Sequence, residues 1–249
     1  MNDGTMRAEI PGPAKIRGGI ELPARREDVE LHTSDGLTLV GELALPLNAE
    51  PVATLVTLHP LPTAGGFMDS HILRKAAARL PALADIAVLR FNFRGVTSPR
   101  GTSDGEFGQG VDEGLDLEAA MAFTTARGLP NPWLLGWSFG TDVVLAHGRD
   151  YPVVGVILLS PPLRTTTPAE LATWAGSSSS MVALIPEFDD FLRPAEAAVA
   201  FAAIPELELV NVDGGRHLWV GEEQTYRVLS EIVARLNPGV LPLPTTWIL

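Results

Sequence analysis

Hydrophobic residues along the chain occur in short runs separated by longer segments of mixed character. The run 52–58 has almost no polar residues, which fits a strand buried on both faces, as in a parallel sheet. Five later runs have the same character: 86–91, 133–137, 153–159, 181–186 and 207–212. Segments that resemble helices lie between them: 68–80, 110–126, 139–149, 195–203 and 222–236. This alternation predicts an α/β protein with a doubly wound, mostly parallel sheet.

A hairpin is expected before these runs, because apolar segments at 29–31 and 37–45 flank the turn residues Thr33 to Gly36. It brings the sheet to about eight strands. We predict one domain over 27–236, preceded by an N-terminal extension at 1–26. The apolar, proline-broken segment 237–249 is interpreted as a strap on the domain. The alternative is a tail that docks on a second subunit, which leaves a homodimer open.

Composition narrows the function classes. The 249 residues carry a net charge of −12, which argues against a nucleic-acid partner because such proteins need a positive face. The chain contains no cysteine, so disulfides and thiolate metal sites are excluded. No stretch approaches the roughly 18 apolar residues that span a bilayer, and the N-terminus lacks the apolar region of a secretory signal. We expect a cytoplasmic protein that does not bind membranes.

A candidate nucleophile lies in the segment Gly136-Trp137-Ser138-Phe139-Gly140. The G-x-S-x-G pattern is weak evidence by itself, but here it follows a buried strand and opens a predicted helix, the context that a nucleophile elbow requires. The tight turn would hold Ser138 in a strained conformation at a helix N-terminus, where free amides favour negative charge. The alternative interpretation is a βα loop of a nucleotide-binding fold.

A serine hydroxyl needs a neighbouring base, and the chain has five histidines. His217 is the candidate because it alone follows the last predicted strand; an exposed loop histidine is the alternative. The acid should precede it in chain order, at the end of the previous strand. Asp189 and Asp190 both qualify, with Asp189 favoured, and Glu187 is a weaker third candidate. Adjacent residues point in different directions, so we expect only one aspartate to face His217.

An oxyanion hole needs two amide donors. We expect the first from Phe139, which follows the nucleophile, and the second from the loop after the strand 52–58. Proline has no N–H, so Pro60 and Pro62 leave Leu61 as the free amide between His59 and Thr63. A rigid turn without a catalytic part is the alternative.

These motifs resemble the α/β-hydrolase superfamily from about Val29 to Leu236. The further segments His59-Pro60-Leu61-Pro62 and Arg90-Phe91-Asn92-Phe93-Arg94-Gly95 are similar to a small, nearly lidless bacterial subgroup of serine hydrolases or esterases. The resemblance implies the α/β-hydrolase fold and a lid inserted after the sixth strand. Here that connection, 160–180, has room for one short helix over the site.

The leading hypothesis is therefore a serine esterase that acts on small acyl substrates without a metal or organic cofactor. We also assign substrate-binding roles to His59, Trp137 and Trp174. Thioester, peptide or lactone cleavage on the same triad is the enzymatic alternative, and a ligand-sensing protein without activity is the non-enzymatic one. Fold by itself does not decide between them.

Overall fold

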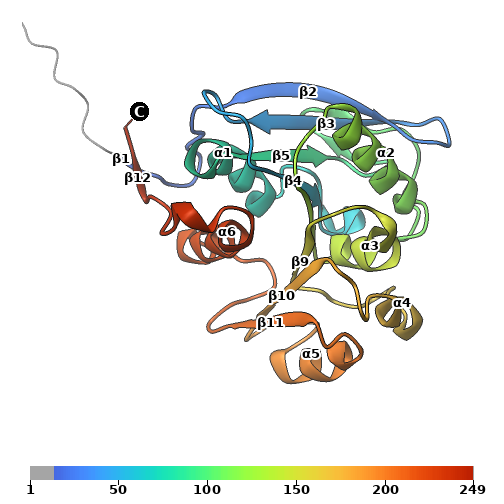
Figure 1. The fold of residues 1–249 in the computed structure, drawn as a ribbon. Coiled ribbons are helices and arrows are strands. Elements are labelled where there is room, and N and C mark those ends of the chain that lie inside the picture. Colours follow the sequence, from blue (N-terminus) through green and yellow to red (C-terminus); the bar gives the residue numbers. More distant parts are fainter. Residues whose placement is uncertain (1–13, 249) are drawn as a thin grey trace, which may run out of the picture.

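The computed structural model describes residues 14–248, which form a central eight-stranded sheet with helices on both faces (Figure 1). The strand order is β11-β10-β9-β8-β4-β5-β3-β2. The edge hairpin β2–β3 is antiparallel and β3 pairs antiparallel with β5, whereas all other pairs are parallel. The strands are β2 (Arg25–His32), β3 (Thr38–Leu45), β4 (Ala53–Leu58), β5 (Ile86–Phe91), β8 (Pro132–Trp137), β9 (Gly155–Leu159), β10 (Ser180–Pro186) and β11 (Leu207–Val212). The predicted doubly wound, mostly parallel sheet is confirmed.

Two apolar layers hold the helices to the sheet. Helices α1 and α6 cover one face, and α2 and α3 cover the other (Figure 1). Strands β4, β5 and β9 are buried along their whole length, as their continuous apolar runs predicted. Strand β11 lies at the sheet edge with one neighbour, so it is only partly buried. The helices are α1 (His71–Ala84), α2 (Glu113–Ala126), α3 (Phe139–His147), α4 (Pro168–Thr173), α5 (Pro194–Ala200) and α6 (Glu222–Leu236).

Two helices begin later than the sequence pattern predicted, because local hydrogen bonds hold the preceding residues outside the helix. Before α1, the Met68 amide donates to the side chain of Asn92 (2.9 Å). Before α2, the amides of Gly108 and Gly110 donate to the Glu113 carboxylate (2.8 and 2.6 Å). Such a carboxylate in the first turn also complements the helix dipole.

The chain termini of the described part lie together beside α6. The short strands β1 (Ala14–Lys15) and β12 (Thr246–Trp247) pair antiparallel (Figure 1). Leu243 is buried and the Tyr226 hydroxyl donates to its carbonyl (3.1 Å), so the C-terminal segment is attached to the domain at Leu243. Leu22 is buried as well. The expected boundary at residue 27 falls inside β2 and after this core residue. Residues 1–13 and 249 lie outside the described part.

The connection between β9 and β10 contains the single short helix α4. Thr167 and Glu170 form a capping box at its start. Leu171 and Trp174 are buried in the same apolar layer as α3, so α4 packs against the body of the domain. A second small hairpin, β6 (Thr97–Ser98) and β7 (Gly101–Thr102), follows β5. Within residues 14–248, none of the helices combines the length and apolar character needed to cross a bilayer.

Candidate active site

Ser138 occupies a strained turn between β8 and α3. Its φ of 52° and ψ of −121° lie in a region that non-glycine residues rarely adopt. The turn is tight enough that a Cβ on Gly136 would meet the Gly140 carbonyl oxygen at 2.5 Å, and one on Gly140 would meet the Leu58 carbonyl oxygen at 2.2 Å. Glycine at both positions therefore lets strand and helix approach closely, and the serine stands at the helix N-terminus.

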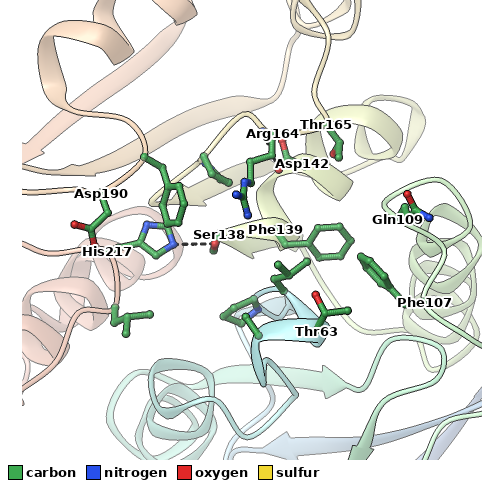
Figure 2. A pocket seen from close by; sticks show the side chains of 16 residues that line it. Thr63, Phe107, Gln109, Ser138, Phe139, Asp142, Arg164, Thr165, Asp190 and His217 are labelled. Atoms are coloured by element: carbon green, nitrogen blue, oxygen red, sulfur yellow. Dashed lines mark hydrogen bonds between the residues drawn. The ribbon is translucent and has the colours of Figure 1, made fainter.

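Three side chains from three separate loops form a continuous hydrogen-bonded row. His217 Nε2 lies 2.8 Å from Ser138 Oγ (Figure 2). On its other side, His217 Nδ1 lies 3.0 Å from Asp189 Oδ2. With its proton on Nδ1, a neutral His217 donates to Asp189 and accepts from the serine hydroxyl. All three side chains are nearly buried, with exposed fractions of 9%, 7% and 2% for Ser138, His217 and Asp189. This is the geometry of a base that activates a hydroxyl and is oriented by a carboxylate.

Asp189 is held as an anion by its neighbours. Burial raises the pKa of its carboxyl, but the hydrogen bonds from His217 and from the Phe191 amide (2.8 Å) outweigh burial and hold the pKa below its usual value. Asp190 is exposed, and its carboxylate points away from Ser138 on the far side of His217 (Figure 2). Glu187 accepts from the Gly214 amide (2.7 Å), so it braces the loop that carries the histidine. Of the three candidate acids, the structure thus brings Asp189 to His217 and does not bring Asp190 or Glu187 there.

Two of the residues that line the cavity beside Ser138 have main-chain amides without a hydrogen-bond acceptor in the described residues. Leu61 and Phe139 both line it, and in residues 14–248 neither amide donates a hydrogen bond to another group. The loop that carries Leu61 is closed on itself: the amides of Ala64 and Gly66 both donate to the Leu61 carbonyl (3.1 and 3.0 Å). A Cβ on Gly66 would collide with the Pro60 carbonyl oxygen at 2.1 Å, so glycine is required there. Free amides beside a nucleophile suit the developing charge of an oxyanion.

The cavity in front of Ser138 has a volume of about 690 Å³ and mostly apolar walls. Figure 2 shows Phe107 and Phe139 on one side of it and His217 on the other. The lining residues are Pro60, Leu61, Thr63, Ala64, Phe107, Gln109, Ser138, Phe139, Asp142, Pro162, Arg164, Thr165, Asp190, Phe191, His217 and Leu218. A cavity of this size could admit a small organic substrate.

The predicted substrate-binding roles of His59, Trp137 and Trp174 are wrong. All three side chains are at most 2% exposed, and none lines the cavity. The His59 ring bonds to main-chain groups on both sides, Trp137 Nε1 donates to the His217 carbonyl (3.2 Å), and Trp174 Nε1 donates to the Leu145 carbonyl (2.9 Å). Each ring fixes a loop or helix around the site. The large apolar area of the two tryptophan rings favours burial, and the His59 ring is buried because both of its nitrogens have main-chain partners.

Sequence reasoning missed most of the cavity wall. Phe107 and Gln109 follow the small hairpin β6–β7, Arg164 and Thr165 precede α4, and Phe191 follows Asp189. These positions lie in loops without a periodic pattern, so only their place after the carboxyl ends of strands could have indicated them. Within residues 14–248, no three histidine, aspartate or glutamate side chains cluster as a metal site requires.

Solved structures with the same fold cover nearly the whole chain. An α-β serine hydrolase homologue from Coxiella burnetii matches with a TM-score of 0.70 and 24% identity, covering 84% of this chain and 96% of that one. An α/β serine hydrolase without a lid, from Xanthomonas campestris, gives 0.67 and 27%, with 88% and 95% covered. An esterase from Pyrococcus furiosus gives 0.69 and 19%, with 90% and 99% covered. The fold is therefore the α/β-hydrolase fold, as the motifs implied.

Comparisons of sequence alone cover less of the chain than the structural comparisons do. No protein-family model matches the chain. An uncharacterized protein of Rickettsia prowazekii is 35% identical over 121 residues, which are 46% of this chain and 47% of that protein. The chain thus matches about half the length of this curated relative.

Proposed function

We propose that this member of the α/β-hydrolase superfamily cleaves carboxylic esters through an acyl-enzyme formed on Ser138. One observation carries the proposal: the Ser138–His217–Asp189 hydrogen-bonded row adjoins a cavity that is also lined by Leu61 and Phe139, the two residues expected to supply oxyanion donors. Each element alone has a structural explanation. Their convergence on one point matches what acyl transfer needs, namely a nucleophile, a base, an orienting anion and an oxyanion site.

In the first half of the reaction, Ser138 Oγ attacks the acyl carbon while its proton passes to His217 Nε2. The carbonyl electron pair moves to the oxygen, and the Leu61 and Phe139 amides donate to the resulting oxyanion. Collapse of this tetrahedral intermediate breaks the ester C–O bond. The leaving alkoxide takes the proton from His217, and the acyl group stays on Ser138.

In the second half, a water molecule replaces the alcohol. His217 takes its proton as the water oxygen attacks the acyl carbon, and Ser138 leaves with that proton restored to Oγ. Asp189 keeps its charge throughout. Its role is to fix the imidazole tautomer with Nδ1 protonated and to stabilise the imidazolium that forms in each half-reaction.

The cavity walls favour small or accessible esters. Helix α4 packs beside α3, so the cavity mouth is bordered by the loop residues Pro162, Arg164 and Thr165. The paired rings of Phe107 and Phe139, 5.4 Å apart, offer an apolar surface for an acyl chain. A protein without a large cap has little surface to enclose a long lipid chain.

The test uses two readouts on wild type and on Ser138→Ala: labelling by a fluorophosphonate probe, and release of p-nitrophenol from a short-chain p-nitrophenyl ester. We expect wild type to be labelled and to turn over, and Ser138→Ala to do neither. Ser178→Ala is the matched control, because Ser178 is exposed and lies outside the cavity. Turnover that persists in Ser138→Ala would overturn the proposal.

Two other functions give different results in the same assay. A thioesterase, peptidase or lactonase on this triad would still be labelled at Ser138 and would prefer its own substrate to the aryl ester. A ligand-sensing protein would bind small molecules in the cavity without turnover. No contact in the site favours either over ester hydrolysis.

A further inference from the structure

One cation faces the cavity from the segment before α4. Among the described residues that line the cavity, Arg164 is the only lysine or arginine. Figure 2 shows its guanidinium pointing into the cavity on the side of Ser138. An exposed arginine is ordinarily a solvated surface residue, so its surroundings decide whether it has a further role.

The backbone at Arg164 is anchored. Its amide donates to Asp142 Oδ2 (3.4 Å), and the Thr166 amide donates to Asp142 Oδ1 (3.2 Å). Asp142 is buried in the first turn of α3, four residues after the nucleophile. The segment is therefore tied to the helix that also carries Ser138, so the base of the arginine side chain has a defined position relative to the nucleophile.

The guanidinium itself is held by an aromatic ring. It lies 5.2 Å from the centroid of the Phe191 ring, which in turn lies 4.5 Å from the His217 ring centroid. A cation over a ring face is attracted by the ring quadrupole. This stack connects Arg164 to the proposed catalytic base through one intervening side chain.

The guanidinium has no acidic partner. No carboxylate in residues 14–248 lies within 4.0 Å of it, although the chain has 30 acidic residues and only 18 basic ones. Several other arginines are ion-paired, for example Arg94 with Asp116 and Arg100 with Glu42. The Asp142 carboxylate accepts from the amides of Arg164 and Thr166, and the Asp190 carboxylate points away beyond His217. The donors of Arg164 thus remain available to a ligand.

We propose that Arg164 binds a carboxylate on the substrate, so that the preferred esters are anionic monoesters with a free carboxylate near the scissile carbonyl. This inference rests on the proposed ester hydrolysis. A planar guanidinium can bond a carboxylate through two parallel N–H donors. The cavity lining also includes Asp142 and Asp190, and the protein has a net charge of −12, so Arg164 supplies the local positive charge that such a substrate needs to approach.

The test compares matched esters on one set of variants. The acyl-side pair is the mono-p-nitrophenyl ester of adipic acid and its methyl ester, which lacks the free carboxylate. The leaving-group pair is 3-carboxy-4-nitrophenyl acetate and p-nitrophenyl acetate. For each pair the ratio of kcat/KM, anionic over neutral, is measured after subtraction of the uncatalysed rate. In Arg164→Gln we expect this ratio to fall about 10-fold or more in at least one pair.

Two variants separate charge and geometry from general damage. Arg164→Lys keeps the charge but loses the two parallel N–H donors of the guanidinium, so its ratio should lie between those of wild type and Arg164→Gln. Arg74→Gln removes the same charge from an exposed position on α1 outside the cavity, and its ratio should match wild type. Unchanged ratios in Arg164→Gln for both pairs would overturn this inference and leave ester hydrolysis intact. Absence of wild-type turnover on all four esters would instead count against the proposed function.

Discussion

His59 and His217 are both buried histidines at the carboxyl edge of the sheet, yet their surroundings differ completely. His59 follows β4, and its ring is closed by main-chain groups: Nε2 accepts from the Phe93 amide (3.0 Å), and Nδ1 donates to the Pro60 carbonyl (2.7 Å). His217 follows β11, and both of its ring nitrogens meet side chains, Asp189 and Ser138. One ring is a brace for two loops, whereas the other connects an anion to a hydroxyl.

The difference separates a histidine that holds structure from one that can move a proton. Burial lowers the pKa of His59 to about 4, so the ring stays neutral at physiological pH, and it is not exposed to the cavity. Its bond to the Pro60 carbonyl braces the loop from which Leu61 lines the cavity. His217 lines the cavity, and its Nδ1 lies 3.0 Å from the Asp189 carboxylate. The same residue type therefore braces a loop at position 59 and, in the proposed mechanism, transfers a proton at position 217.

The largest expected effect concerns the histidine in the hydrogen-bonded row. Replacing His217 with Gln removes the base, and we expect kcat for a p-nitrophenyl ester to fall by about 10⁴-fold or more. The thermal midpoint should move by only a few degrees, because the ring borders the open cavity. A p-nitrophenol release assay measures kcat, and a melting curve on the same preparation measures the thermal midpoint. A fall of less than 10-fold would contradict the role of His217.

The second-largest expected effect tests which carboxylate orients the His217 ring. Asp189→Asn removes the anion that fixes the imidazole tautomer, and kcat should fall by about 10³- to 10⁴-fold. Asp190→Asn is the matched control, since it neutralises an adjacent, exposed carboxylate, and its effect should stay within about 3-fold. Parallel kcat measurements at pH 7.5 decide the assignment. Equal losses in the two variants would show that the distinction drawn from the geometry is wrong.

The third prediction concerns the loop that His59 braces. Leu61 has a φ of −51°, which proline also adopts, so Leu61→Pro removes the amide hydrogen with little change in backbone conformation. Loss of one oxyanion donor should lower kcat by about 10²- to 10³-fold. Leu61→Ala keeps the amide and removes the side chain, so it isolates the donor. If both variants lose the same activity, the Leu61 side chain rather than its amide is what matters.

The sequence predicted the sheet, the elbow and the hydrogen-bonded row because each depends on local signals. Buried parallel strands are continuous apolar runs, and a glycine-flanked serine between strand and helix has a restricted geometry. The choice between Asp189 and Asp190 depended on which way the backbone turns after β10, which adjacent residues do not reveal. The assignments of His59, Trp137 and Trp174 failed because burial of a ring depends on packing from distant elements, including the loop that carries Phe93.

The cavity wall was the least predictable part for a related reason. Phe107, Arg164 and Phe191 come from three loops that are distant in sequence, and no periodicity marks them. The role proposed for Arg164 depends on its neighbours in the structure. Asp142 accepts from its amide, the Phe191 ring lies 5.2 Å from its guanidinium, and no carboxylate in residues 14–248 is within 4.0 Å of that group. Recognition residues of this kind depend on tertiary structure more than catalytic motifs do.

The smallest expected effect is on stability and concerns His59. Its pKa is about 4 when folded and about 6.5 when unfolded, so between these values only the unfolded chain binds the proton. Folding stability from this group is therefore complete above pH 6.5 and decreases as the pH falls toward 4. The loss amounts to roughly 3 kcal/mol at most. The variant His59→Gln has no titratable side chain at this position, so its free energy of unfolding should lack this dependence on pH.

The measurement is urea unfolding of wild type and His59→Gln at several values between pH 7 and pH 4.5. Asp116 acts in the opposite direction over much of this range, because burial raises its pKa to about 6 and the folded state then holds an extra proton. The wild-type curve alone mixes the two groups. The difference between wild type and variant cancels Asp116, and this difference should shrink as the pH falls. A difference that stays constant from pH 7 to pH 4.5 would mean that His59 can be protonated in the folded state, and the contrast with His217 would then lose its physical basis.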